Sequence, residues 1–136
     1  MRCPRLVCVD TSFLISLIRR EASAEKKLET YLVHDERIAT TPICACELFA
    51  GAYRSSKRDS EIRKVRGLLS RMELLEFSMR ACEGFGRIRQ QLEAAGTPIG
   101  DLDIIIASIA LAHGESLLSR DTQHFSKIPG LHIETW

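Results

Sequence analysis

Five acidic residues of this chain stand beside apolar runs instead of in charged stretches, and their types and positions could support chemistry. Asp10 directly follows a short apolar run and Asp121 ends the segment "ESLLSRD", whereas Asp101 and Asp103 precede a long apolar run, "IIIASIALA". Glu47 lies near the beginning of a helical pattern at residues 43–55. Carboxylates of this kind are candidates for general acid–base chemistry or for binding a metal ion.

Clustered carboxylates repel one another, and burial adds to the cost of each charge, so such a group needs a cation to neutralise it. Oxygen ligands without His or Cys suit the hard ions Mg²⁺ or Mn²⁺. A bound divalent ion can orient and deprotonate a water and neutralise the charge that develops on a phosphodiester. The acids therefore predict hydrolysis of phosphodiester bonds, provided that the fold brings them together.

The elements that must position the acids are short apolar runs alternating with longer helical patterns. We predict strands at residues 6–9 and 37–41, in "MELLEF", in "ESLLSRD" and in "GLHIETW". Helices are expected at 13–18, 22–34, 43–55, 62–72, 85–96 and 101–114. The alternation indicates a parallel sheet with helices on both faces. Because ligands of such sheets bind beyond the carboxyl ends of the strands, the acids are expected to share one crevice.

Composition gives only broad limits. The chain has 136 residues, 45% of them hydrophobic, and no linker or repeat, which predicts one domain over residues 1–136. A net charge of +1 gives no global signal for nucleic acid or membrane. The N-terminus has no secretory pattern and the longest apolar run is too short to cross a membrane, so we expect a cytoplasmic protein without membrane contact.

Cysteine and histidine add no chemistry of their own in this interpretation. The cysteines are an odd set without C-x-x-C spacing, for which we expect reduced and mostly buried thiols: Cys3, Cys8, Cys44, Cys46 and Cys82. Surface or capping roles are expected for the scattered histidines, which are His34, His113, His124 and His132.

Residues 53–71 form a basic run that could contact phosphates. The favoured alternative is a solvated helix face with Lys57–Glu61 and Asp59–Arg63 pairs. The residues that contact nucleic acid stay unknown at this stage.

Each acid also has a purely structural interpretation. Asp10 and Asp101 could be helix N-caps, Glu47 a solvated helix residue, and Asp121 part of a turn. The hydroxyls and backbone amides of Thr11 and Ser12 could support catalysis by capping the helix and by holding Asp10 or a water on the ion. The functional interpretation is favoured because several acids fall at one edge of the inferred sheet.

Four segments, "VDTSFLI", "TPICACELFAG", "GTPIGDLDIIIASIAL" and "LLSRDTQHFSKIPGLHIETW", resemble the PIN-domain family and within it the VapC-type toxins of toxin–antitoxin pairs. The resemblance covers nearly the whole chain. It implies a three-layer α/β/α fold with about five parallel strands and a ribonuclease that depends on Mg²⁺ or Mn²⁺. It further implies a homodimer, RNA as substrate and a VapB-type antitoxin as partner.

The resemblance also ranks the acids. It assigns catalysis and metal binding to Asp10, Glu47, Asp103 and Asp121. Asp101 lies where the family varies, and it is either a helix cap, which we favour, or an auxiliary metal ligand.

Competing functions are weaker. A haloacid-dehalogenase-type phosphatase needs an acid two positions after Asp10, where Ser12 stands, and a response-regulator receiver needs an acid pair that is absent. A PIN-domain nuclease that processes RNA without being a toxin, and an inactive PIN-like module that binds RNA or a partner, stay open as alternatives.

Overall fold

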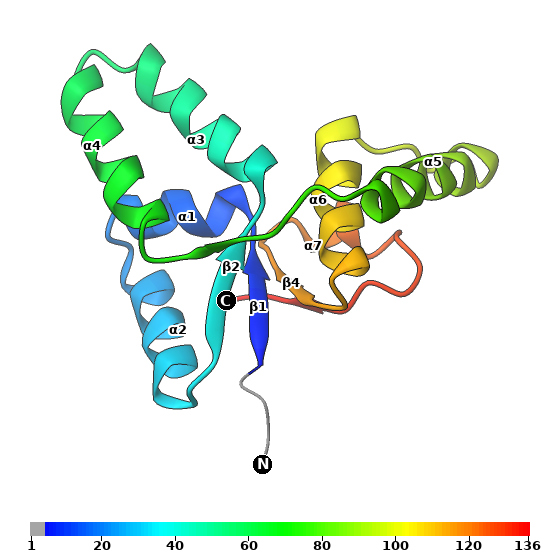
Figure 1. Cartoon of the computed structure of the whole chain (residues 1–136), viewed down its shortest axis with the longest axis horizontal. Coiled ribbons are helices and arrows are strands. Elements are labelled where there is room, and N and C mark those ends of the chain that lie inside the picture. Colours follow the sequence, from blue (N-terminus) through cyan, green and yellow to red (C-terminus); the bar gives the residue numbers. More distant parts are fainter. Residues whose placement is uncertain (1–4) are drawn as a thin grey trace.

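A parallel sheet of five strands organises the computed structural model, which describes residues 5–136 (Figure 1). The strands are β1 (Leu6–Val9), β2 (Arg37–Thr40), β3 (Glu73–Leu74), β4 (Ser116–Leu118) and β5 (Ile133–Glu134). They lie in the order β3-β2-β1-β4-β5, and every neighbouring pair is parallel. The α/β fold class predicted from the sequence, with about five parallel strands, is confirmed.

Helices cover both faces of this sheet. They are α1 (Thr11–Ile18), α2 (Ala22–Val33), α3 (Pro42–Arg54), α4 (Arg58–Leu69), α5 (Met79–Ala94), α6 (Asp101–Ala112) and α7 (Thr122–Phe125). Figure 1 shows α1 to α4 on one side of the sheet and α5 to α7 on the other. The reason is the handedness of the connections: β1 to β3 run in one direction across the sheet and β3 to β5 in the other, so right-handed crossovers place the two helix groups on opposite faces.

The core lies between the central strands and the helices that pack on them. Val7, Cys8 and Val9 of β1 are fully buried, as are Leu117 and Leu118 of β4, as expected for strands covered on both faces. Helix α6 is apolar on nearly every side because it too is buried. None of the helices in the described residues is long and apolar enough to span a membrane.

Capping residues set where the helices begin and end. Asp10, Thr41 and Ser78 accept hydrogen bonds from backbone amides in the first turns of α1, α3 and α5. Gly114 follows α6 with a φ of 69°, a left-handed conformation that glycine adopts without strain. The predicted end of this helix at Gly114 therefore agrees with the structure.

Several element boundaries differ from the prediction. The strands expected in "MELLEF" and "GLHIETW" shrink to two residues each, because β3 and β5 are sheet edges that pair on one side only. Helix α7 was missed, since its four residues are too few to show a helical period.

The strand order reverses around β1. The chain passes from β1 to β2 on one side, while β4 lies on the other side of β1. Just beyond β1, the backbone amide of Asp10 donates to the carbonyl of Leu118 at 3.1 Å. Such reversals open a crevice at the carboxyl ends of the strands. Asp10 and the residues after Leu118 lie at that edge.

Candidate active site

Asp10 is the acid at the end of the central strand. It is the N-cap of α1: its Oδ1 accepts the backbone N–H of Phe13 at 3.2 Å and the hydroxyl of Ser12 at 2.6 Å. The side chain is buried, with 6% of its surface exposed. Burial raises the pKa of Asp10, although its three hydrogen bonds act in the opposite direction. The protein thus holds this carboxylate in place at a cost in electrostatic free energy.

Ser119 is the second support of Asp10 and was missed from the sequence. Its fully buried hydroxyl donates to Oδ2 of Asp10 and accepts the backbone N–H of Asp121 at 2.9 Å. One hydroxyl therefore links the acid after β1 to the acid after β4. Nothing in the sequence distinguishes this serine except its place two residues before Asp121.

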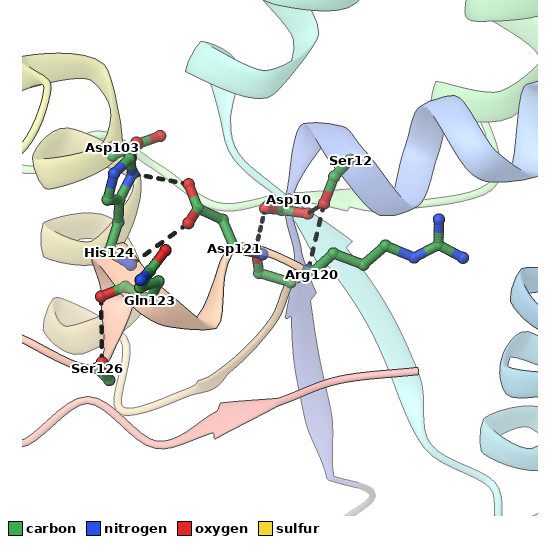
Figure 2. A network of polar contacts seen from close by, with 9 residues as sticks. Asp10, Ser12, Asp103, Arg120, Asp121, Gln123, His124 and Ser126 are labelled. Atoms are coloured by element: carbon green, nitrogen blue, oxygen red, sulfur yellow. Dashed lines mark hydrogen bonds and ion pairs between the residues drawn. The ribbon is translucent and has the colours of Figure 1, made fainter.

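Asp103 and Asp121 converge on His124, as Figure 2 shows. Nδ1 of His124 lies 2.8 Å from Oδ2 of Asp121 and 3.5 Å from Oδ2 of Asp103. One donor atom from each of these three residues lies within 4.8 Å of the other two. Asp103 comes from the first turn of α6, Asp121 is the N-cap of α7, and His124 lies within α7.

The acids of this cluster repel one another. The pKa of Asp103 is raised, first by burial and then by the charge of Asp121, while His124 lowers it and Glu47 raises it slightly further. The charge of Asp103 in turn adds to the raised pKa of Asp10. The site therefore carries more negative charge than its own side chains neutralise.

Glu47 reaches the same edge from α3. Its Oε1 accepts the hydroxyl of Thr11 at 2.7 Å, and its side chain is partly buried. Thr11 and Ser12 thus each hold one acid. The capping role expected for their hydroxyls is wrong, because the side chain of Asp10 itself caps α1.

Asp101 is separate from this group. The N-cap of α6 is Gly100, so the cap expected at Asp101 is wrong: Asp101 is the first helical residue, and its carboxylate lies 3.5 Å from Nε of Arg89. An acid inside the first turn interacts with the helix dipole instead of capping. The three-residue group of donor atoms does not include Asp101, nor does it include Asp10 or Glu47. Asp101, at the start of α6, differs from those two acids in pairing with Arg89.

His124 lies at the surface, as expected, with 47% of its side chain exposed. Its ring also contacts two of the predicted acids, which the sequence interpretation did not anticipate. The signal that could have found it is the three-residue spacing from Asp121, which places both side chains on one side of a helical turn.

The cysteines and the basic run also differ in part from the prediction. Among the described residues Cys8 and Cys44 are buried and Cys46 and Cys82 are exposed, so "mostly buried" holds for half of them. Cys3 lies outside the described residues. In the basic run the recorded ion pair joins Glu61 to Lys64 at 3.1 Å instead of to Lys57.

Comparison with known proteins identifies the family. The family model of the PIN domain matches residues 7–131. The chain belongs to the PIN-domain family. Two relatives place this PIN domain among the VapC proteins: Ribonuclease VapC2 of Rickettsia felis is 30% identical over 94% of this chain and 96% of its own. The tRNA(fMet)-specific endonuclease VapC of Salmonella typhimurium is 31% identical over the same shares.

Solved structures agree with this assignment. VapBC2 from Rickettsia felis, bound to a DNA fragment from its promoter, superposes with a TM-score of 0.89 at 31% identity, covering 96% of this PIN domain and 98% of that chain. DNA-bound VapBC from Salmonella typhimurium superposes with a TM-score of 0.88 at 30% identity, covering 98% of this chain and 99% of that chain. The resemblance seen in the four sequence segments is therefore confirmed.

Proposed function

We propose that this PIN domain is a divalent-metal-dependent endoribonuclease that acts as the toxin of a toxin–antitoxin pair. The observation that carries the proposal is the convergence of Asp103 and Asp121 beside Asp10 at the carboxyl edge of the sheet. It is supported by the relatives, which are named as ribonucleases or as a tRNA-specific endonuclease. Asp10, Glu47, Asp103 and Asp121 are the residues to which we assign catalysis and metal binding.

The chemistry of the donor set fits a hard divalent ion. The raised pKa values of Asp10 and Asp103 arise from burial and from neighbouring carboxylates, which is the electrostatic situation that a doubly positive ion relieves. Mg²⁺ and Mn²⁺ are bound through a few carboxylates together with waters and substrate phosphates. Because a carboxylate accepts about four hydrogen bonds or ligands, Asp10 keeps capacity for an ion beyond its three present donors.

In the proposed mechanism, hydroxyl side chains of this chain hold the acidic side chains in position. When bound, the divalent ion supplies positive charge for the scissile phosphate and lowers the pKa of a water. Ser12 and Ser119 fix the two oxygens of Asp10, and Thr11 fixes Oε1 of Glu47. Side chains already held in position by hydrogen bonds need no reorganisation when the reaction begins.

The test is cleavage of a labelled single-stranded RNA with Mg²⁺ or Mn²⁺, with and without EDTA. We expect cleavage that depends on the ion and that Asp10→Asn reduces by at least about 100-fold. Asp35→Asn is the matched control, because Asp35 is exposed and has a φ of 57°, which Asn also adopts. Cleavage that survives EDTA, or that is equal in both variants, would contradict the proposal. RNA binding without any cleavage would favour the inactive binding module.

A VapB-type antitoxin is the partner that we propose. Support comes from the Rickettsia felis and Salmonella typhimurium relatives, whose structures are VapBC complexes. Induced expression of the wild-type chain should arrest growth, whereas Asp10→Asn should not. Harmless expression of a chain that cuts RNA in vitro would favour a nuclease that processes RNA without being a toxin.

The homodimer and the cytoplasmic location also stay proposals. Light scattering of the purified chain tests the dimer. Its exposed apolar side chains include Leu74 of β3, Met79 of α5 and Leu102 of α6, which a subunit interface could cover. Cell fractionation tests the location.

A further inference from the structure

A nitrogen donor lies among the oxygen donors of the candidate site. The sequence interpretation took the site to consist of carboxylates only, but Nδ1 of His124 is within 3.5 Å of both Asp103 and Asp121. The three residues form the one group of possible metal ligands found among residues 5–136. This difference bears on which ion the site takes.

The ring of His124 is held so that Nδ1 faces the acids. Both of its recorded polar contacts run through Nδ1, and its backbone N–H donates to Oδ1 of Asp121 at 3.3 Å. The next residue, Phe125, is 1% exposed, so α7 is anchored in the core. The ring itself is 47% exposed, so these two contacts, and not burial, orient Nδ1 toward the acids, where it can coordinate an ion.

We propose that Nδ1 of His124 is a ligand of the divalent ion and makes this site select Mn²⁺ over Mg²⁺, an inference that rests on the proposed metal-dependent nuclease. Both Mg²⁺ and Mn²⁺ bind carboxylate oxygens, but Mn²⁺, a transition ion, gives up a water for an imidazole nitrogen more readily than Mg²⁺, which dehydrates reluctantly and keeps several of its waters. A site of two or more carboxylates and one imidazole therefore gains affinity for Mn²⁺ that it does not gain for Mg²⁺.

The experiment measures metal binding directly. Mn²⁺ is titrated into the metal-free full chain by calorimetry and by electron paramagnetic resonance, and Mg²⁺ is then used as a competitor. His124→Asn places an amide oxygen or nitrogen near the position of Nδ1 and keeps the backbone N–H. His132→Asn is the matched control, because the side chain of His132 is exposed on the C-terminal segment.

We expect His124→Asn to weaken Mn²⁺ binding by about tenfold or more, since even residues that only orient a ligand are worth about 10- to 100-fold in affinity. Mg²⁺ binding should change less, so the Mn²⁺-to-Mg²⁺ affinity ratio falls. His132→Asn should leave both affinities unchanged. Pulsed resonance of bound Mn²⁺ in the wild-type chain should show a coupling to nitrogen, and this readout requires no variant to fold.

Other results would overturn the inference. If His124→Asn weakens Mn²⁺ and Mg²⁺ binding equally, His124 only orients the carboxylates. If the variant binds both ions more tightly, the imidazole of the wild-type chain competes with the ion. Absence of the nitrogen coupling in wild type would also exclude direct ligation. If any of these occurs while RNA cleavage still needs Mg²⁺ or Mn²⁺, the proposed nuclease stands and this inference fails. If no ion binds at all, both fail.

Discussion

The substitution Ser119→Ala should show how much the hydrogen bonds that support Asp10 contribute to the free energy of unfolding. The hydroxyl of Ser119 is fully buried, donates to Oδ2 of Asp10 and accepts the backbone N–H of Asp121. Alanine removes both bonds without changing the backbone. It leaves a buried carboxylate oxygen without a donor and an amide of a partly exposed residue without an acceptor.

The magnitude follows from these two bonds. A hydrogen bond to a charged group contributes about 1.5–3 kcal/mol, and an unmet backbone donor that water can partly reach adds about 1 kcal/mol. We therefore expect a loss of about 3 kcal/mol in the free energy of unfolding at pH 7. For a domain of this size that corresponds to a fall of about 10 °C in Tm. Metal affinity should also fall by about tenfold or more, because Asp10 and Asp121 lose their common support.

The assay is urea unfolding of the metal-free chain at several pH values. Ser126→Ala is the matched control: its exposed hydroxyl donates to the carbonyl of Gln123 at 3.2 Å, and its loss should cost less than about 0.5 kcal/mol. Because the bond from Ser119 lowers the pKa of Asp10, the penalty of Ser119→Ala should shrink as the pH falls and Asp10 becomes protonated. A penalty equal to that of the control, or one independent of pH, would refute this account of Ser119.

Three further predictions test the charge, the C-terminus and the thiols. The pKa of Asp103 is raised above 3.8, so its contribution to metal-free stability is present below that pH and is lost as the pH rises through the folded-state value. Asp103→Asn should accordingly be more stable than wild type at pH 7 in urea unfolding, with a flatter pH profile, yet inactive on RNA; lower stability at pH 7 would contradict this. Trp136→Ala should cost about 2 kcal/mol by the same assay, because its partly buried ring packs edge-on against an aromatic ring of α1, with centroids 4.9 Å apart; an unchanged midpoint would contradict it. In a Cys3→Ser background a thiol reagent should label Cys46 and Cys82 rapidly and the two buried thiols, whose pKa values burial raises, only on unfolding; four equally fast thiols would contradict the packing.

Hydrophobic patterning was enough to predict the fold class. β1 is continuously apolar and β4 contains two buried leucines because these strands are covered on both faces, and the alternation with helices then favours parallel pairing. Patterning could not give the lengths of β3 and β5, which depend on pairing at the sheet edges. Patterning also could not give α7, because its four residues are too few to show a helical period.

The candidate site was predictable in its charged members and not in its neutral ones. Asp10, Asp103 and Asp121 are conspicuous because a charge beside an apolar run is unusual. Ser119 and His124 have a weaker signal: each is marked only by its spacing from Asp121, and neutral side chains are common at such positions. Their importance depends on distances across the sheet edge, which only the folded chain determines.

The central place of β1 has a consequence for how the protein is made. The first strand to leave the ribosome pairs with β2 on one side, but its other neighbour, β4, is among the last segments to be synthesised. A nascent chain that stops before β4 carries Asp10, Glu47 and Asp103 without Ser119 to join them to Asp121. If Asp121 has the catalytic role proposed for it, the chain becomes competent for catalysis only when translation is nearly complete, and truncation at any point before Asp121 should give an inactive fragment.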